Sequence, residues 1–153
     1  MKIFGIIPAR FASTRLPGKP LADIGGRTLI EHVWRRAGRA KTLDRVIVAT
    51  DDARIAAEVK RFGGEAVMTP VACASGTDRL AVVAKKIDCD IVVNIQGDEP
   101  FILPATIDRL CAPLVKDKTL LMSTLAAPLP TEDYSNPNAV KVVCDLQGNA
   151  LYF

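Results

Sequence analysis

Short apolar runs recur along the chain, separated by charged residues, glycine and proline. Helical spacing of apolar residues occurs between these runs. The alternation predicts an α/β fold with a mostly parallel central sheet and helices on both of its faces. Four runs have the length and residue types of buried strands: Ile3–Pro8, Arg45–Thr50, Glu65–Met68 and Asp90–Ile95.

Amphipathic segments predict the helices that cover this sheet. Thr28–Arg39 and Asp52–Phe62 each carry an apolar stripe at helical spacing. A third helix is expected to start near Ser75, an N-cap residue with Asp78 three positions later. A fourth is expected to start near Pro104.

The last third of the chain predicts extended structure. Leu120–Ala127 has the composition of a strand, and a connection rich in proline and asparagine follows it to Asn138. Val140–Asp145 and Ala150–Phe153 predict two strands joined by a turn. Because the sequence stops within an apolar run, we expect residues 1–153 to form a single domain that lacks its C-terminal part.

Composition narrows the class of protein. The 153 residues suffice for one domain, and 49% hydrophobic with 24% charged residues is typical of globular proteins. No apolar run approaches the roughly 20 residues of a membrane span, and no leader is evident, so we expect a cytoplasmic protein without a membrane partner. A net charge of +3 gives no reason to expect a nucleic-acid partner.

Some residue types that often form sites have a structural interpretation here. The four cysteines are far apart without a CxxC pair, so we expect reduced and buried side chains. His32 falls beside the apolar stripe of the first helix and Trp34 within it, which favours structural roles for both. The cysteines are Cys73, Cys89, Cys111 and Cys144.

The segment after the first strand gathers cations without any acid. Its 13 residues, Pro8–Pro20, include Arg10, Arg15 and Lys19. In an α/β fold it lies at the carboxyl end of the sheet, where ligands bind. Arginine can hold two phosphate oxygens and lysine supplies a point charge, so the loop predicts a phosphate site. It matches neither the dinucleotide-binding nor the P-loop glycine motif, and a solvated basic loop is the alternative.

The same loop carries a family resemblance. Ile7–Arg10 with Ser13–Leu21 closely resembles the CMP-sugar synthetases, within them the 3-deoxy-manno-octulosonate (KDO) cytidylyltransferases. The resemblance implies a Rossmann-like nucleotide-diphospho-sugar transferase fold. It also implies a nucleotidyltransferase that joins CTP to KDO, releases pyrophosphate and supplies lipopolysaccharide biosynthesis. Further matching motifs follow in order along the whole chain: Val48–Asp51, Ser75–Leu80, Asn94–Pro100 and Asn136–Lys141.

Catalytic roles follow from the resemblance for Arg10, Lys19 and Asp98. Arg10 and Lys19 would hold the triphosphate, with Arg15 as a third ligand. Asp98 would bind Mg²⁺, for which carboxylate oxygen is a preferred ligand. The resemblance places the second metal-binding acid, and most of the sugar pocket, at positions beyond Phe153.

The other implied contacts leave alternatives open. Ala9 and Gln96 match positions near the nucleotide, where acceptors must distinguish cytosine from uracil. Ser75 would contact the nucleotide or only cap a helix, and Arg79 would contact it or only support the loop. Lys141 would reach the sugar carboxylate or lie on a solvated edge strand.

Three expectations concern the protein as a whole. The acceptor is KDO or, alternatively, another acidic sugar. A non-catalytic nucleotide-binding module is the other class that these residues allow. The family resemblance implies a homodimer, with the later strands in its interface.

Overall fold

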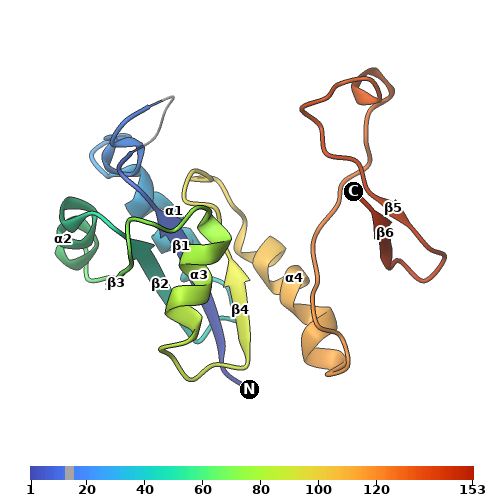
Figure 1. Ribbon diagram of the computed structural model, residues 1–153, viewed down its shortest axis with the longest axis horizontal. Coiled ribbons are helices and arrows are strands. Elements are labelled where there is room, and N and C mark those ends of the chain that lie inside the picture. The colour runs from blue at the N-terminus through green and yellow to red at the C-terminus, as the bar shows by residue number, and fades with distance from the viewer. Residues whose placement is uncertain (13–15) are drawn as a thin grey trace.

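A parallel sheet forms the core of the first two-thirds of the chain in the computed structural model, which describes residues 1–12 and 16–153 (Figure 1). All pairings in this sheet are parallel, and its strand order is β3-β2-β1-β4. These strands match the four predicted apolar runs to within one residue at each end, so the predicted sheet is confirmed. They are β1 (Ile3–Ala9), β2 (Arg45–Thr50), β3 (Glu65–Met68) and β4 (Ile91–Asn94).

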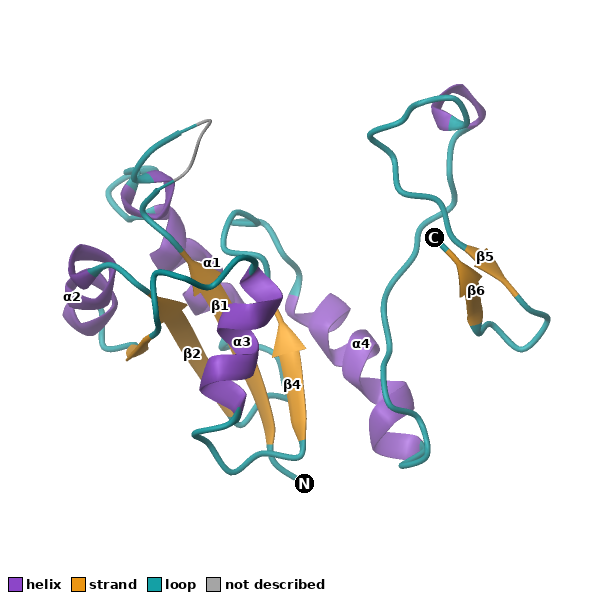
Figure 2. Cartoon of the chain, in the orientation of Figure 1, coloured by secondary structure: helices purple, strands orange, loops and turns teal. Residues whose placement is uncertain are grey.

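Helices cover both faces of the sheet because side chains alternate along each strand. On β1, Ile7 faces one apolar core and Ile6 faces the other. Helices α1, α2 and α4 contribute to the first core and α3 to the second. Figure 2 shows α3 in front of the strands and α1 behind them. The helices are α1 (Leu29–Ala37), α2 (Ala53–Arg61), α3 (Gly76–Ala84) and α4 (Pro104–Lys116).

A buried carboxylate joins α1 to α2. Glu31 is only 4% exposed, and it accepts hydrogen bonds from Arg35 Nε at 2.7 Å and Arg61 Nη2 at 2.9 Å. Burial by itself raises the pKa of Glu31, but the hydrogen bonds and charges of the two arginines together outweigh burial and lower that pKa. Arg61 belongs to α2, so these ion pairs fix the two helices to each other.

The C-terminal third leaves the sheet (Figure 1). It contains a 3-10 helix, η2 (Thr131–Asp133), and an antiparallel hairpin of β5 (Val143–Cys144) and β6 (Ala150–Tyr152). The hairpin confirms the two predicted C-terminal strands, although both are shorter than predicted. The predicted strand over Leu120–Ala127 is wrong. A strand needs a paired neighbour, and no backbone hydrogen bond links residues 121–127 to another strand among the described residues.

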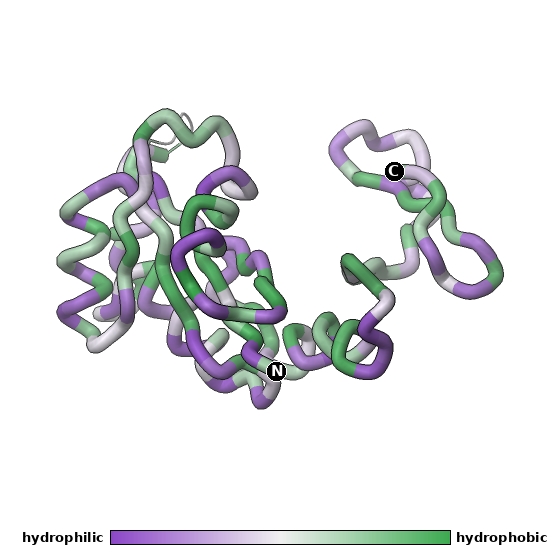
Figure 3. Tube along the Cα trace, turned by 60° about the horizontal axis from the view of Figure 1, so that its bottom comes forward, coloured by the Kyte–Doolittle hydropathy of each residue, from purple (hydrophilic) through white to green (hydrophobic). Residues whose placement is uncertain are grey.

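Apolar side chains in this third remain exposed, with Leu121 at 97% and Tyr152 at 75%. Figure 3 shows hydrophobic and hydrophilic residues interleaved along this part of the chain. Cys144 of the hairpin is exposed too, so the prediction that every cysteine is buried is wrong, although all four cysteines are free thiols. Within the described residues, no helix is both long enough and apolar enough to cross a membrane.

Glu31 should contribute to acid resistance. Because its pKa is lower in the folded chain than the unfolded value of 4.5, the stabilisation is complete above that pH and is lost as the pH falls through the folded pKa. Glu31→Gln should therefore lower Tm more at pH 7 than at about pH 3. Circular dichroism melts at both pH values measure this, and equal losses of Tm would contradict the assignment.

Candidate functional site

The sheet opens at the carboxyl end of β1. The β1–β4 ladder ends at the pair Ile6–Asn94, whereas the β1–β2 ladder continues to Ala9–Thr50. Ile95 N–H donates to the Ile6 carbonyl oxygen, so the backbone N–H and C=O of Ile6 point toward β4. Because the direction alternates along a strand, the backbone groups of Pro8, two residues later, point toward β4 as well. Pro8 has no N–H to extend that ladder. The strands therefore part here, at the point where the covering helices change face.

A cavity of about 490 Å³ occupies this opening. Its walls come from the end of β1, the basic loop, the turn before α3 and the loop after β4. Seven of the predicted site residues line it: Ala9, Arg10, Lys19, Ser75, Arg79, Gln96 and Asp98. Arg15, the remaining predicted nucleotide ligand, lies outside the described residues. The structure thus brings together side chains that are up to 89 positions apart in the sequence.

Gly97 allows the loop after β4 to cross the end of β1. A Cβ at this position would lie 2.9 Å from the Pro8 carbonyl oxygen and 3.4 Å from Ile7 Cγ2. The first distance is shorter than carbon–oxygen contact allows, and the oxygen belongs to backbone that cannot rotate away. The close approach directs Gln96 and Asp98, on either side of Gly97, to the cavity.

The ends of the basic loop are fixed to one another. Gly18 N–H donates to the Phe11 carbonyl oxygen over 2.9 Å, and its φ of 71° suits glycine, which has no Cβ to clash. A 3-10 helix, η1 (Lys19–Leu21), begins directly after Gly18 and presents Lys19 to the cavity. The guanidinium of Arg54 stacks on the Phe11 ring, 3.4 Å from its centroid, which attaches the loop to α2.

Opposite charges face each other across the cavity. Lys19 Nζ lies 2.6 Å from Asp98 Oδ2, and the two side chains are 39% and 50% exposed. At this exposure the pair contributes little to stability, so both charges are available to a ligand. Arg10 is exposed at the cavity wall, and within the described part of the chain no carboxylate pairs with it.

The first turn of α3 forms the opposite wall. Ser75 Oγ accepts the Asp78 backbone N–H over 3.1 Å, and the Asp78 carboxylate accepts the Ser75 N–H over 3.0 Å, which is a capping box. The predicted cap at Ser75 is confirmed. Gly76 packs on Pro8, because a Cβ there would lie 3.3 Å from Pro8 Cγ. The helix start is therefore set directly against β1.

Arg79 is a buried member of the cavity wall, 3% exposed. Its Nη2 donates to Asp51 Oδ2 over 2.7 Å, and its Nη1 donates to Thr69 Oγ1. The sequence motifs contain Asp51 and Arg79, but they did not reveal that the two residues meet, and Thr69 carried no signal at all. The position of Asp51 directly after β2 was the only indication that it lies at this edge of the sheet.

Two other candidates differ in their placement. Gln96 lines the cavity and is exposed there. Lys141 does not line it, and its Nζ donates to the backbone carbonyl of Asn136 in the C-terminal third. The structure therefore separates the predicted sugar ligand from the predicted nucleotide ligands.

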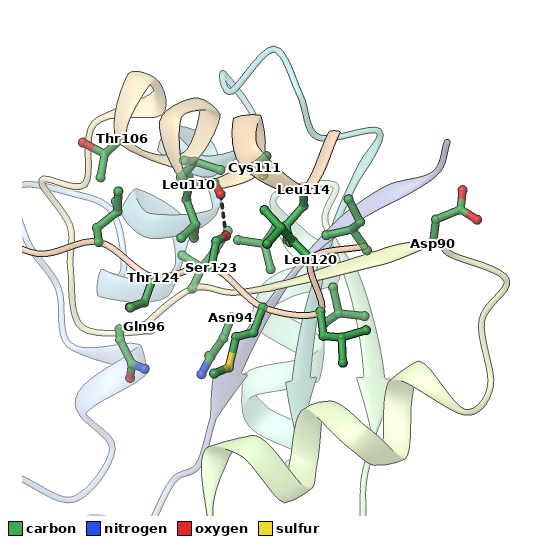
Figure 4. Close-up of a pocket in the computed structure, with 18 of the residues that line it drawn as sticks. Asp90, Asn94, Gln96, Thr106, Leu110, Cys111, Leu114, Leu120, Ser123 and Thr124 are labelled. Carbon is green, nitrogen blue, oxygen red and sulfur yellow. Dashed lines mark hydrogen bonds between the residues drawn. The ribbon is translucent and has the colours of Figure 1, made fainter. Parts of the chain in front are cut away.

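A larger cavity of about 1270 Å³ lies on the other side of β4 (Figure 4). The walls are β4, the inner face of α4 and the segment after α4, which Ser123 Oγ fastens by donating to the Leu110 carbonyl oxygen over 2.7 Å. Gln96 borders both cavities. Arg10 and Lys19 border only the smaller one, and it is the better candidate site despite its size because convergent cations are what an anionic ligand requires.

The chain matches a family model described as "Cytidylyltransferase" over residues 4–153. A 3-deoxy-manno-octulosonate cytidylyltransferase from Geobacter metallireducens is 54% identical over 154 residues, covering 100% of this chain and 61% of that protein. One from Myxococcus xanthus is 58% identical, covering 97% of this chain and 60% of the relative. The chain thus spans about 61% of the length of the curated relatives it matches.

Solved structures agree with this match. The structure of CMP:2-keto-3-deoxy-manno-octonic acid synthetase complexed with CTP is 41% identical, with a TM-score of 0.92 over 99% of this chain and 63% of that one. A cytidylyltransferase from Leptospira borgpetersenii is 27% identical, with a TM-score of 0.68 over 77% of this chain and 50% of that one. The Rossmann-like nucleotidyltransferase fold expected from the sequence is confirmed.

Gly97→Ala should displace the loop that carries Asp98. The added Cβ meets backbone at 2.9 Å, so we expect a loss of stability of about 1–3 kcal/mol, measured by denaturant unfolding. Gly38→Ala is the matched control, because Gly38 has φ −65° and its Cβ would lie 3.4 Å from the nearest atom. Equal stability of the two variants would show that Gly97 does not need its close approach.

Proposed function

The chain belongs to the cytidylyltransferase family, and we propose that the protein transfers a cytidylyl group from CTP to 3-deoxy-manno-octulosonate, releasing pyrophosphate. One observation carries the proposal. Arg10, Lys19 and Asp98 surround a single cavity in a chain whose fold matches a CTP-complexed synthetase with a TM-score of 0.92. The names of the curated relatives support the same substrates.

In the proposed complex the triphosphate lies against the basic loop. Arg10 binds two phosphate oxygens with its planar guanidinium, and Lys19 places a compact charge beside them. The nucleoside lies toward Ser75 and Gln96, where the exposed amide of Gln96 offers a donor and an acceptor. Ala9, which is 4% exposed, presents backbone rather than a side chain to the base.

The proposed reaction is a displacement at the α-phosphorus. The anomeric oxygen of the sugar forms a bond to this phosphorus, the bond to the β-bridging oxygen breaks, and pyrophosphate leaves with the electron pair. The hydroxyl proton passes to water. Such a displacement requires alignment and neutralised charge, not a covalent nucleophile, and Arg10 with Lys19 supplies that neutralisation.

Asp98 fits the role of a Mg²⁺ ligand. Mg²⁺ usually takes one or two protein carboxylates and completes its shell with water and substrate phosphates. Asp98 offers a half-exposed carboxylate beside the proposed triphosphate. The described residues contain no cluster of three acidic, histidine or cysteine side chains, so a site shared with the nucleotide fits better than a closed protein site. Bound there, the ion would stabilise charge on the phosphates.

The remaining parts of the proposal concern partners. Exposed apolar side chains on the hairpin, among them Val143 and Tyr152, support a homodimer with that hairpin in its interface. Sedimentation of the protein used for the assay gives its mass, and a monomer would rule the dimer out. The modest net charge and short apolar runs support a cytoplasmic enzyme that binds neither nucleic acid nor membrane.

Assays of pyrophosphate release by the full-length protein test the substrates. With CTP and Mg²⁺ we expect turnover with KDO and none with a neutral hexose, which lacks the acceptor carboxylate. Sialic acid carries a carboxylate but has a larger carbon skeleton than KDO, so we expect far less turnover with it. UTP in place of CTP should lower the rate. Turnover with sialic acid but not KDO would show that the acceptor is another acidic sugar. Tight CTP binding without any turnover would favour a nucleotide-binding module.

In the proposed complex the Lys19–Asp98 ion pair opens when the triphosphate binds, and this competition can be measured. Without metal, Asp98→Asn should strengthen CTP binding about two- to fivefold, because it removes an anion that competes with phosphate for Lys19. Lys19→Ala should weaken binding with or without metal. With Mg²⁺, both Lys19→Ala and Asp98→Ala should lower turnover about 10²- to 10³-fold.

Isothermal titration with CTP in the presence of EDTA measures the first effect. Lys60→Ala serves as the control, because Lys60 is exposed and lines neither cavity. Weaker metal-free binding by Asp98→Asn would contradict the competition between Asp98 and phosphate.

A further inference from the structure

We infer that Asp51 and Arg79 form a positioning pair that holds one wall of the nucleotide cavity, and that Arg79 does so without being a ligand of the nucleotide. The inference rests on the proposed function, since it assigns the loop between β3 and α3 to CTP binding. It gives a role to Asp51, which ends one of the sequence motifs and has no part in the displacement itself.

The guanidinium of Arg79 joins the ends of three elements. It projects from the first turns of α3, donates to Asp51 just after β2 over 2.7 Å, and donates to Thr69 just after β3. The Arg79 side chain is 4% exposed and that of Asp51 is 14% exposed. In this shielded position the pair is far less screened than the pair across the cavity.

The loop that this pair holds lies between Thr69 and Gly76. Its last residues, Cys73, Ala74 and Ser75, line the cavity. At its start, Thr69 N–H donates to the Thr50 carbonyl oxygen over 2.8 Å. The loop has little apolar anchorage of its own, with Val71 79% exposed.

Arg79 connects the two ends of this loop. Thr69 precedes the loop, and Arg79 itself belongs to the helix that follows, so its hydrogen bond to Thr69 closes the loop across its base. Asp51 then attaches that closed unit to the end of β2. This guanidinium and its two acceptors thus hold the cavity wall to the sheet, in addition to the Gly76–Pro8 contact and the Thr69–Thr50 hydrogen bond.

The geometry separates Arg79 from Arg10 and Lys19 of the basic loop. Arg10 is exposed at the cavity, whereas Arg79 is buried and its charge is matched by a carboxylate. Asp51 does not line the cavity. Asp51 thus affects the nucleotide only through Arg79. Arg79 as a nucleotide ligand and Arg79 as a support of the wall therefore predict opposite effects of substituting Asp51 on CTP binding.

Asp51→Asn distinguishes these roles. If Arg79 were a phosphate or base ligand, removing the anion beside it would leave CTP binding unchanged or stronger. If Arg79 positions the wall, the same substitution releases the wall and weakens binding. A displaced wall loses one or two of its hydrogen bonds to the nucleotide, each worth about a tenfold factor in affinity, so we expect Kd for CTP to rise about 10- to 100-fold.

The experiment is titration of CTP into the full-length protein and four variants: Asp51→Asn, Arg79→Gln, the double variant and Glu31→Gln. The first two should weaken binding to a similar degree, and the double variant should add little, because all three lose the same pair. KM for CTP should rise while kcat at saturating CTP is retained.

Glu31→Gln is the matched structural control. Glu31 is also a buried carboxylate held by arginine, but it lies between α1 and α2 and lines neither cavity. It should lower Tm without changing Kd for CTP. A rise in Kd that is equal in Glu31→Gln and Asp51→Asn would overturn the inference, because it would reflect general loss of stability.

Unchanged or tighter CTP binding by Asp51→Asn would also overturn it. If that variant does not fold, Thr69→Val keeps the charge pair and removes the second acceptor. Weaker CTP binding at an unchanged Tm then supports the inference, and unchanged binding overturns it. Failure of the unsubstituted protein to bind CTP would instead count against the proposed function.

Discussion

β1 is hydrogen-bonded to β2 on one side and to β4 on the other, and only the first ladder continues past Ile6. The second ends because Pro8 has no N–H to offer. The cavity lies in the gap between the ends of β1 and β4, and residues of the basic loop and of the loop after β4 line it. A single missing backbone donor thus places the cavity, and the residues around it are arranged relative to Pro8.

Charge is organised differently at two depths of this site. Close to solvent, Lys19 and Asp98 pair across the cavity with large exposed fractions, so a ligand can separate them at small cost. Beneath the wall, Asp51 and Arg79 are shielded and tied to Thr69, so their contact resists replacement. The exposed charges suit binding and the shielded ones suit alignment, and a phosphoryl displacement requires both.

Sequence reasoning anticipates the sheet and its helices because these elements follow from local periodicity. The four strands appear where apolar runs predict them, and Ser75 caps α3 as its spacing with Asp78 indicates. The position of the basic loop also follows, since a parallel strand order sends the end of every strand to one edge. What fails is the prediction that depends on a distant neighbour. Leu120–Ala127 has strand-like residues but no strand beside it.

Long-range contacts within the site are equally hidden from sequence patterns. Nothing in the spacing of Asp51, Thr69 and Arg79 indicates that they meet, because their contact depends on how two βα connections lie in space. Lys141 shows the converse, since its motif suggests a ligand but the chain places it away from the cavity.

The backbone crossing at Gly97 limits how such a site can be altered. Because the contact is with the carbonyl oxygen of Pro8, no change of a neighbouring side chain can make room for a larger residue at position 97. A library intended to change the nucleotide preference should therefore keep Gly97 and Pro8 fixed. Variation belongs at Cys73 and Ala74, which line the same cavity from the loop between β3 and α3 and belong to no strand of the sheet.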